Sequence, residues 1–123
     1  MSLTVAGFDS STLDYKIVKE TASTNTVNTN VTGASGNLYS ITIANQANSG
    51  IFLKIHNGGS PVVGTTNPDM TFYIPTSSNN TKRIDIPGGW PFSILNFWTV
   101  TGDAVASTAA PAGGNVSVIL VTS

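Results

Sequence analysis

Along most of the chain, apolar residues recur at every second position, and the segments that show this alternation are separated by Gly, Pro and Asn. A period of two is typical of a strand that buries one of its faces, and these three residue types favour turns. Segments with a helical period are almost absent. The pattern therefore predicts an all-β chain of about seven or eight short strands.

The strongest hairpin signal lies in the middle of the chain. Segment 38–44, LYSITIA, places Tyr39 on the same face as its two isoleucines. Residues 48–50, NSG, tolerate a positive φ, and segment 51–59, IFLKIHNGG, then alternates again. We predict that these two segments pair as a β-hairpin.

Two more strands, each closed by a proline, are expected at residues 70–74 and 82–86. In both of them apolar side chains alternate with side chains that suit a surface. Arg83 and Asp85 share the outward face of the second strand and are expected to form a surface ion pair. The residues expected to face the core are Met70, Phe72, Ile74, Ile84 and Ile86.

Segment 90–102, WPFSILNFWTVTG, is apolar on both faces. A strand that is covered on both faces lies in the centre of a sandwich or at a contact between subunits. Its large residues fall into two alternating sets. One set is Phe92, Ile94, Asn96, Trp98 and Val100, and the other is Leu95 and Phe97. We expect the set that contains Trp98 to face the core. The β-branched segment 115–123 is expected to be an interior strand.

The first third of the chain differs, because its large apolar residues are scattered and are followed by a tract of Thr and Asn. We interpret residues 1–35 as an N-terminal arm with an edge strand, and a mobile terminus is the alternative. Residues 36–123 are expected to form the core of one domain. The predicted fold is an antiparallel β-sandwich, jelly-roll-like, with an extended N-terminal arm, and an open barrel is the alternative.

Charge is scarce, since charged residues make up 9% of the 123 residues and the net charge is −1. Such a chain lacks the field that attracts phosphate backbones or anionic lipid, so neither nucleic acid nor a membrane is an expected partner. The absence of cysteine excludes disulfides and thiolate metal sites. No secretory signal and no long apolar run are seen, so we expect a soluble protein made in a cytoplasm.

Candidate chemistry is sparse. His56 is the only histidine, and a Ser-His-Asp arrangement could use Asp69 or Asp85, but no nucleophile motif singles out a serine. We expect His56 to end a strand and to form local hydrogen bonds. The acidic residues are dispersed without the spacing of a calcium loop. We therefore predict a protein that is not an enzyme and has no catalytic, cofactor-binding or metal-binding residues.

Aromatic side chains raise the possibility of carbohydrate stacking. Trp98 is expected in the core, so the candidates are Tyr39 and Trp90, which follows two glycines and precedes Pro91. A half-exposed ring at Trp90 could cap the sandwich, which is our first expectation, or contact a partner.

The order of segments in about the last two-thirds of the chain resembles small β-sandwich structural proteins of tailed bacteriophages. This resemblance implies a virion protein made in the bacterial cytoplasm, a homotrimer, and a capsid decoration or cement role in contact with the major capsid protein. The shared elements are PVVGT (61–65), NP (67–68), a strand closing in Ile-Pro (74–75), PGG (87–89) with Phe92 after it, TVTG (99–102) before Asp103, and a final apolar strand.

Three functions remain open at this point. The first is capsid decoration, the second is a tail fibre, baseplate or receptor-binding module, and the third is a carbohydrate-binding module. In the decoration hypothesis, the arm and the entrance to the aromatic segment make the contacts to partners or other subunits. The predicted contact residues are Phe8, Leu13, Tyr15, Trp90, Pro91 and Phe92.

Overall fold

The computed structural model describes residues 3–7, 15–76 and 80–123, and their secondary structure consists of strands and loops. The strands form two antiparallel sheets that pack as a β-sandwich, which confirms the predicted fold class. The strands are β1 (Leu3–Gly7), β2 (Lys16–Glu20), β3 (Gly36–Asn45), β4 (Ile51–Asn57), β5 (Met70–Ile74), β6 (Asn80–Phe92), β7 (Leu95–Val100) and β8 (Val116–Thr122).

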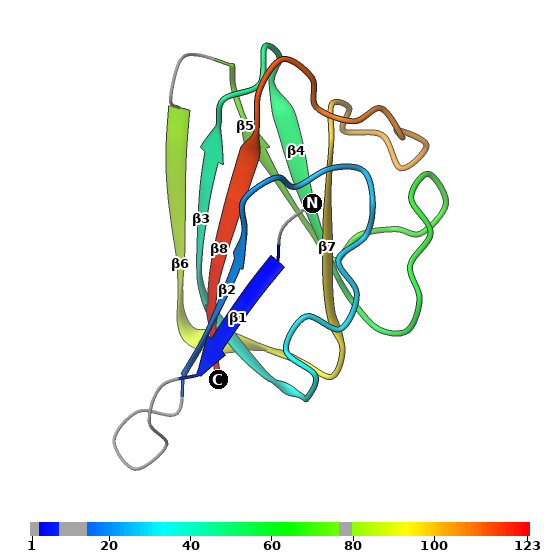
Figure 1. Ribbon diagram of the computed structural model, residues 1–123. Coiled ribbons are helices and arrows are strands. Elements are labelled where there is room, and N and C mark those ends of the chain that lie inside the picture. The colour runs from blue at the N-terminus through cyan, green and yellow to red at the C-terminus, as the bar shows by residue number, and fades with distance from the viewer. Residues whose placement is uncertain (1–2, 8–14, 77–79) are drawn as a thin grey trace.

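The two sheets differ in width. One has five strands in the order β1-β2-β8-β3-β6, and the other has three in the order β5-β4-β7. Figure 1 shows the wide sheet on the left, with β1 and β6 at its two edges. The prediction of an interior C-terminal strand is confirmed, because β8 lies between β2 and β3 and every second side chain from Val116 is buried.

The predicted hairpin between segments 38–44 and 51–59 is wrong, because β3 and β4 belong to different sheets. The chain crosses from one sheet to the other after Asn45, whose side-chain amide donates to Ser49 O at 3.0 Å and to Ile74 O at 3.2 Å. Alternation identifies which side chains are buried, but a hairpin and a crossover between two sheets show the same alternation.

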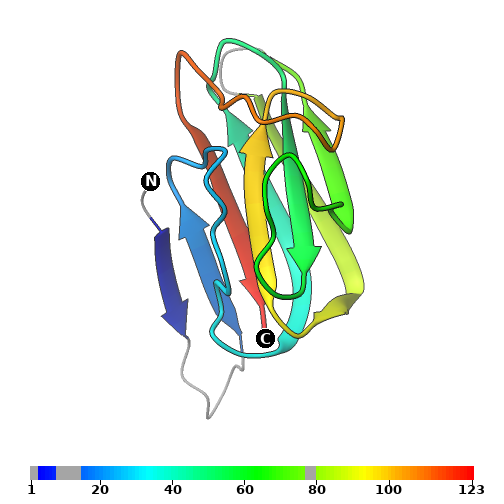
Figure 2. The same cartoon turned by 90° about the vertical axis from the view of Figure 1, so that its right-hand side faces the viewer.

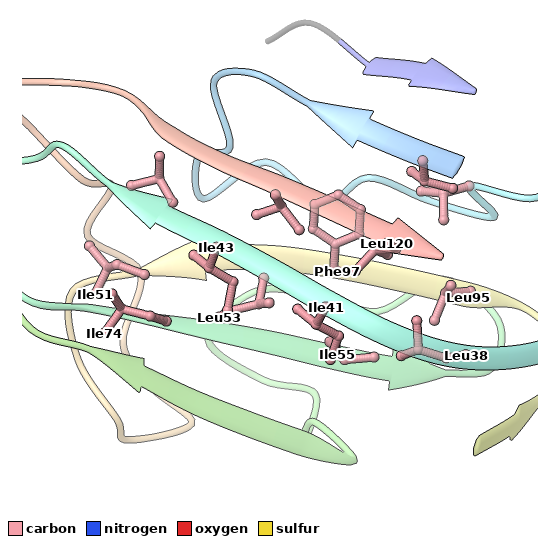
Figure 3. Close-up of a cluster of buried hydrophobic side chains, with 14 of the residues drawn as sticks. Leu38, Ile41, Ile43, Ile51, Leu53, Ile55, Ile74, Leu95, Phe97 and Leu120 are labelled. Carbon is pink, nitrogen blue, oxygen red and sulfur yellow. The ribbon is translucent and has the colours of Figure 1, made fainter. Parts of the chain in front are cut away.

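The core lies between the sheets and is built mainly from branched aliphatic residues (Figure 3). Ile74 is fully buried, and Met70, Phe72, Ile84 and Ile86 pack against the core, as predicted from their parity. The fully buried residues that Figure 3 labels are Leu38, Ile41, Ile43, Ile51, Leu53, Ile55, Ile74, Leu95, Phe97 and Leu120.

Tyr39 does not share the face of Ile41 and Ile43, contrary to the prediction. The register of β3 shifts between Leu38 and Ser40, and Leu38 takes the inward place with no exposed surface. A β-bulge adds one residue to a strand and reverses the parity on one side of it. Tyr39 is that extra residue.

Strand β7 is buried on both faces, as expected, but the faces are the reverse of the predicted ones. Leu95 and Phe97 lie in the core between the sheets. Trp98 is directly opposite Lys54 of β4 on the outer side of the narrow sheet and is 1% exposed. A bend at Ser93 and Ile94 separates β6 from β7, so the parity of Phe92 does not continue into β7. Loops of the same chain cover this outer side (Figure 2).

The described residues of the predicted arm are part of the sandwich. Strand β2 pairs with β8, and Val18 is fully buried. The following segment crosses to the narrow sheet and lies along β7. Its backbone hydrogen bonds with β7 join Asn28 to Phe97 in both directions, Val31 N to Leu95 O, and Thr99 N to Thr24 O.

Asn96 holds this crossing segment to the end of β4. It is fully buried, its amide donates to His56 O at 3.1 Å and Gly58 O at 2.8 Å, and its Oδ1 accepts from Asn30 N at 2.9 Å. Each backbone group left unpaired by truncation costs about 1–3 kcal/mol.

We therefore expect Asn96→Ala to lower the free energy of unfolding by about 2–4 kcal/mol, because three hydrogen bonds of a buried side chain are lost together. Urea denaturation followed by tryptophan fluorescence measures the change. Asn67→Ala is the matched control, since the side chain of Asn67 is exposed. Equal losses in the two variants would show that the Asn96 contacts do not stabilise the fold.

Candidate interaction surface

The outward side of the wide sheet has no covering segment in the described part of the chain. The long connections 21–35, 58–69 and 101–115 all lie on the side of the narrow sheet (Figures 1 and 2). We call this surface the outer face. The strand register places two rows of residues across its centre, each row running from β2 through β8 and β3 to β6. One row is Ile17, Val121, Ser40 and Asp85, and the next is Lys19, Ile119, Thr42 and Arg83.

The outer face is almost neutral. Its aliphatic residues Ile17, Ile119 and Val121 are half-buried, as expected for side chains that stand on an open sheet. The predicted ion pair is present, since Arg83 Nε donates to Asp85 Oδ1 at 3.0 Å, and both side chains are well exposed. Such a pair contributes about 0–1 kcal/mol. A partner could therefore cover most of this face without removing water from an unpaired ion.

Two tyrosines stand at one end of the outer face. The rings of Tyr15 and Tyr39 meet edge to face, with centroids 5.6 Å apart and planes at 89°. Tyr15 is 41% exposed, whereas Tyr39 is half-buried. Edge-to-face aromatic pairs contribute about 0.5–1.5 kcal/mol beyond the area they bury. The pair holds the exposed ring of Tyr15 in place at this end of the sheet.

A glycine bulge in β6 supports the tyrosine pair. Ser40 pairs with Asp85 and Leu38 pairs with Trp90, so β6 has more residues than β3 between these two pairs. Gly88 and Gly89 lie among these extra residues and have φ values of +82° and +80°. A Cβ on Gly89 would lie 2.8 Å from the ring of Tyr39, whereas a Cβ on Gly88 would meet nothing within 4 Å. The Tyr39 ring therefore lies directly on the Gly89 backbone.

The predicted contact residues do not form one surface. Trp90 is opposite Leu38 and packs against the core as a half-buried ring, and its neighbour Pro91 is exposed. Phe92 is 4% exposed and belongs to the core, so it is not accessible to a partner. Of the predicted arm residues, Tyr15 lies beside this end of the sheet, while Phe8 and Leu13 lie outside the described residues.

Sequence reasoning named Tyr39 as a candidate for carbohydrate stacking, but the alternation did not predict its outward position. Its alternation with Ile41 and Ile43 pointed inward, and only a bulge could reverse it. The available signal was the Pro87-Gly88-Gly89 turn, because consecutive glycines in a strand often mark a bulge.

The opposite side of the molecule holds a buried lysine. Lys54 is 1% exposed, and its Nζ donates to Ala104 O at 2.8 Å, which ties the loop after β7 to β4. Burial lowers the pKa of Lys54 from its ordinary value, and the negative charge of Asp103 opposes this shift. The lysine therefore holds the loop 101–115 to the narrow sheet.

His56 lies near the end of β4 and forms local contacts. Its Nδ1 is 3.2 Å from Asn67 O and 3.5 Å from Asp69 Oδ2, and Asn57 N donates to the same carboxylate oxygen at 2.6 Å. Asp69 is thus the carboxylate that folding brings to His56. These contacts fasten the end of the loop 58–69 to β4.

Over the described ranges, no group of three or more His, Cys, Asp or Glu side chains is placed to hold a metal ion. The same residues include no helix long and apolar enough to cross a membrane.

Gly89→Ala is expected to destabilise the fold by about 1–2 kcal/mol more than Gly88→Ala. Both substitutions put alanine at a positive φ, at a similar cost of about 1 kcal/mol, but only the first adds a methyl group against the Tyr39 ring and Asn37 Cβ. Urea denaturation of the two variants gives the difference, and near-ultraviolet circular dichroism reports on the tyrosine pair. A greater loss in Gly88→Ala would contradict the support of Tyr39 by Gly89.

The Lys54 contacts predict a pH dependence of stability. The pKa of Lys54 is lowered in the folded state from 10.5, so between the two values the unfolded state binds more protons. The stability that this group contributes therefore rises with pH through that window and is at its lowest below the folded pKa. In Lys54→Met this rise is absent.

Urea denaturation at about pH 7 and about pH 10 gives the free energy of unfolding of the wild type and of Lys54→Met. The effect is the increase from the lower to the higher pH that the wild type shows beyond that of the variant. Lys19→Met is the control, because Lys19 is exposed on the outer face. The same pH response in both variants would mean that burial of Lys54 does not disfavour its charge.

Comparison with known proteins gives no family. No protein-family model and no curated protein sequence matches the chain. Among solved structures, the chain is similar to SpX-3, a fucose binding module of Streptococcus pneumoniae. The two are 13% identical over 98% of this chain and 69% of that chain, with a TM-score of 0.38. A likeness of this size carries no argument about ligand or function.

Proposed function

We propose that this protein is a non-enzymatic virion component that decorates and stabilises a bacteriophage head, and that it docks on the capsid shell through the outer face. The resemblance of residues 51–106 and of the final strand to small phage sandwich proteins suggests the virion. The observation that carries the docking role is the outer face itself, a nearly neutral five-stranded sheet surface that no described segment covers.

The chemistry of the outer face suits a protein partner. Half-buried aliphatic side chains at its centre gain about 25 cal/mol for each Å² of apolar surface removed from water. The half-buried Thr42 supplies a hydroxyl group for hydrogen bonds at little desolvation cost, and Arg83 and Asp85 already neutralise each other. The exposed ring edge of Tyr15 extends the surface at one end. Aromatic and aliphatic side chains with few unpaired charges are typical of the centre of an interface.

The size of the outer face implies a modest contact. Five strands spaced by about 4.8 Å and about 20 Å long give a flat area of about 400 Å², which is less than the surface of about 800 Å² per partner in a stable complex. One copy is therefore expected to bind weakly. A decoration protein acts through many copies, because each site that binds only the assembled shell lowers its free energy by RT ln(1 + [L]/Kd), about 2.7 kcal/mol when the free protein is at about 100 times Kd.

Binding to shells tests the proposal. We expect Thr42→Lys to reduce uptake by purified phage shells about tenfold or more, because it adds a charge at the centre of the outer face, next to Arg83. Thr65→Lys, an exposed position in the loop 58–69 on the other side of the molecule, is the matched control. Co-sedimentation of labelled protein with shells that lack it measures the uptake.

Uptake that is equal in the two variants would remove the outer face from the proposal. No uptake by the wild type, together with binding to host cells or to a glycan array, would replace capsid decoration with the receptor-binding or the carbohydrate-binding alternative.

A further inference from the structure

The two sheets have four edges, and three of them show features that prevent pairing with another strand. Natural sheets protect their edges with charges, prolines, bulges or a covering segment. Strand β7 is covered by the backbone of residues 24–31. Strand β5 is bracketed by Pro68 and Pro75, and β6 carries three charged residues, two prolines and the glycine bulge.

The fourth edge, β1, has none of these features. It pairs with β2 on one side, and no described strand pairs with its other side. Its sequence, LTVAG, contains no charge and no proline. Figure 2 shows β1 at the outer margin of the wide sheet.

The core side of β1 is also uncovered. Val5 is directly opposite Val18 in the register, yet Val18 is fully buried whereas Val5 is 45% exposed. Leu3, on the same side of the strand, is 39% exposed. The narrow sheet and the segment along β7 therefore cover β2 but do not reach β1. An open backbone edge and two exposed apolar side chains occur together on one strand.

We infer that β1 pairs antiparallel with β1 of a second copy of this chain, around a two-fold axis perpendicular to the sheet at Val5. This register pairs Leu3 with Gly7 of the other copy and uses all five residues of the strand. The two wide sheets become one continuous sheet, and the exposed Leu3 and Val5 side chains of both copies lie side by side. This contact is separate from the outer face and from the three-fold assembly that the phage resemblance implies.

The charge distribution favours a second copy over another partner. A two-fold contact is self-complementary, so a charge at or near its axis would lie close to the like charge of the other copy. Strand β1 has no charge, and the nearest lysine on the outer face is Lys19 of β2. The two copies of Lys19 would be separated by three strand spacings, about 14 Å, which exceeds the screening length of about 8–10 Å at ordinary salt.

The contact is small, since five residues of strand edge bury much less than about 800 Å² per partner. Association in dilute solution is therefore expected to be weak and to depend on protein concentration. Where copies are held close together, even a weak edge contact becomes populated, because the effective concentration replaces the free one.

Disulfide trapping tests the contact with the full chain. The sequence contains no cysteine, so Val5→Cys introduces a single thiol. Opposite residues of antiparallel strands have Cα atoms about 4.5–5.5 Å apart, which is within the range of a disulfide. We expect Val5→Cys to form a disulfide-linked dimer at least about tenfold faster than Val62→Cys, whose position is 57% exposed in the loop 58–69.

Sedimentation equilibrium of the protein without cysteine supplies a second measurement. The wild type and Val62→Lys are expected to show a weight-average mass that rises with concentration, whereas Val5→Lys lowers the association constant about tenfold or more. Equal rates of disulfide formation for the two cysteine variants, or a wild type that is monomeric at every concentration, would overturn the inference. Neither measurement uses phage shells, so the result is independent of the proposed docking role.

Discussion

The unequal width of the two sheets is the constraint on which the rest of the structure depends. A three-stranded sheet cannot cover five strands, so the inner side chains of β2 need another cover. Residues 24–31 provide it by lying along β7 and extending the narrow sheet by one irregular strand. The extension ends there, which leaves Leu3 and Val5 of β1 exposed on the side that would otherwise be core. Both the crossing segment and the open edge follow from this difference.

Asparagine and lysine side chains fix the irregular segments to this frame. Asn45 holds the crossover between the sheets, Asn96 holds the crossing segment at the end of β4, and Lys54 holds the loop after β7. In each case a buried side chain satisfies backbone carbonyl groups that no strand can reach, which avoids the cost of leaving them unpaired. The chain uses amide groups for most of these contacts, in keeping with its low content of charge. The outer face remains free of such contacts and open to a partner.

Local patterns in the sequence predicted what depends on local geometry. Alternation identified the sandwich, the inward residues of β5 and β6, and the interior position of β8. It could not identify strand partners, because the pairing of β3 with β6 and β8 depends on residues far away in the chain. It also failed where the parity is broken, at the Tyr39 bulge and at the bend before β7, and for this reason Tyr39 was placed in the core and the two faces of β7 were exchanged. Tyr15 was the predicted contact residue that the structure places beside the outer face.

The position of β8 also affects how the protein can acquire its structure during synthesis. Residues 116–122 lie between β2 and β3, which have no direct backbone pairing with each other. Until the ribosome has released these residues, β1 and β2 can form only an isolated hairpin, and such two-stranded units are at best marginally stable in water. The wide sheet can therefore be completed only after β8 has been translated, and a nascent chain carries the edges of β2 and β3 that face β8 unpaired until then.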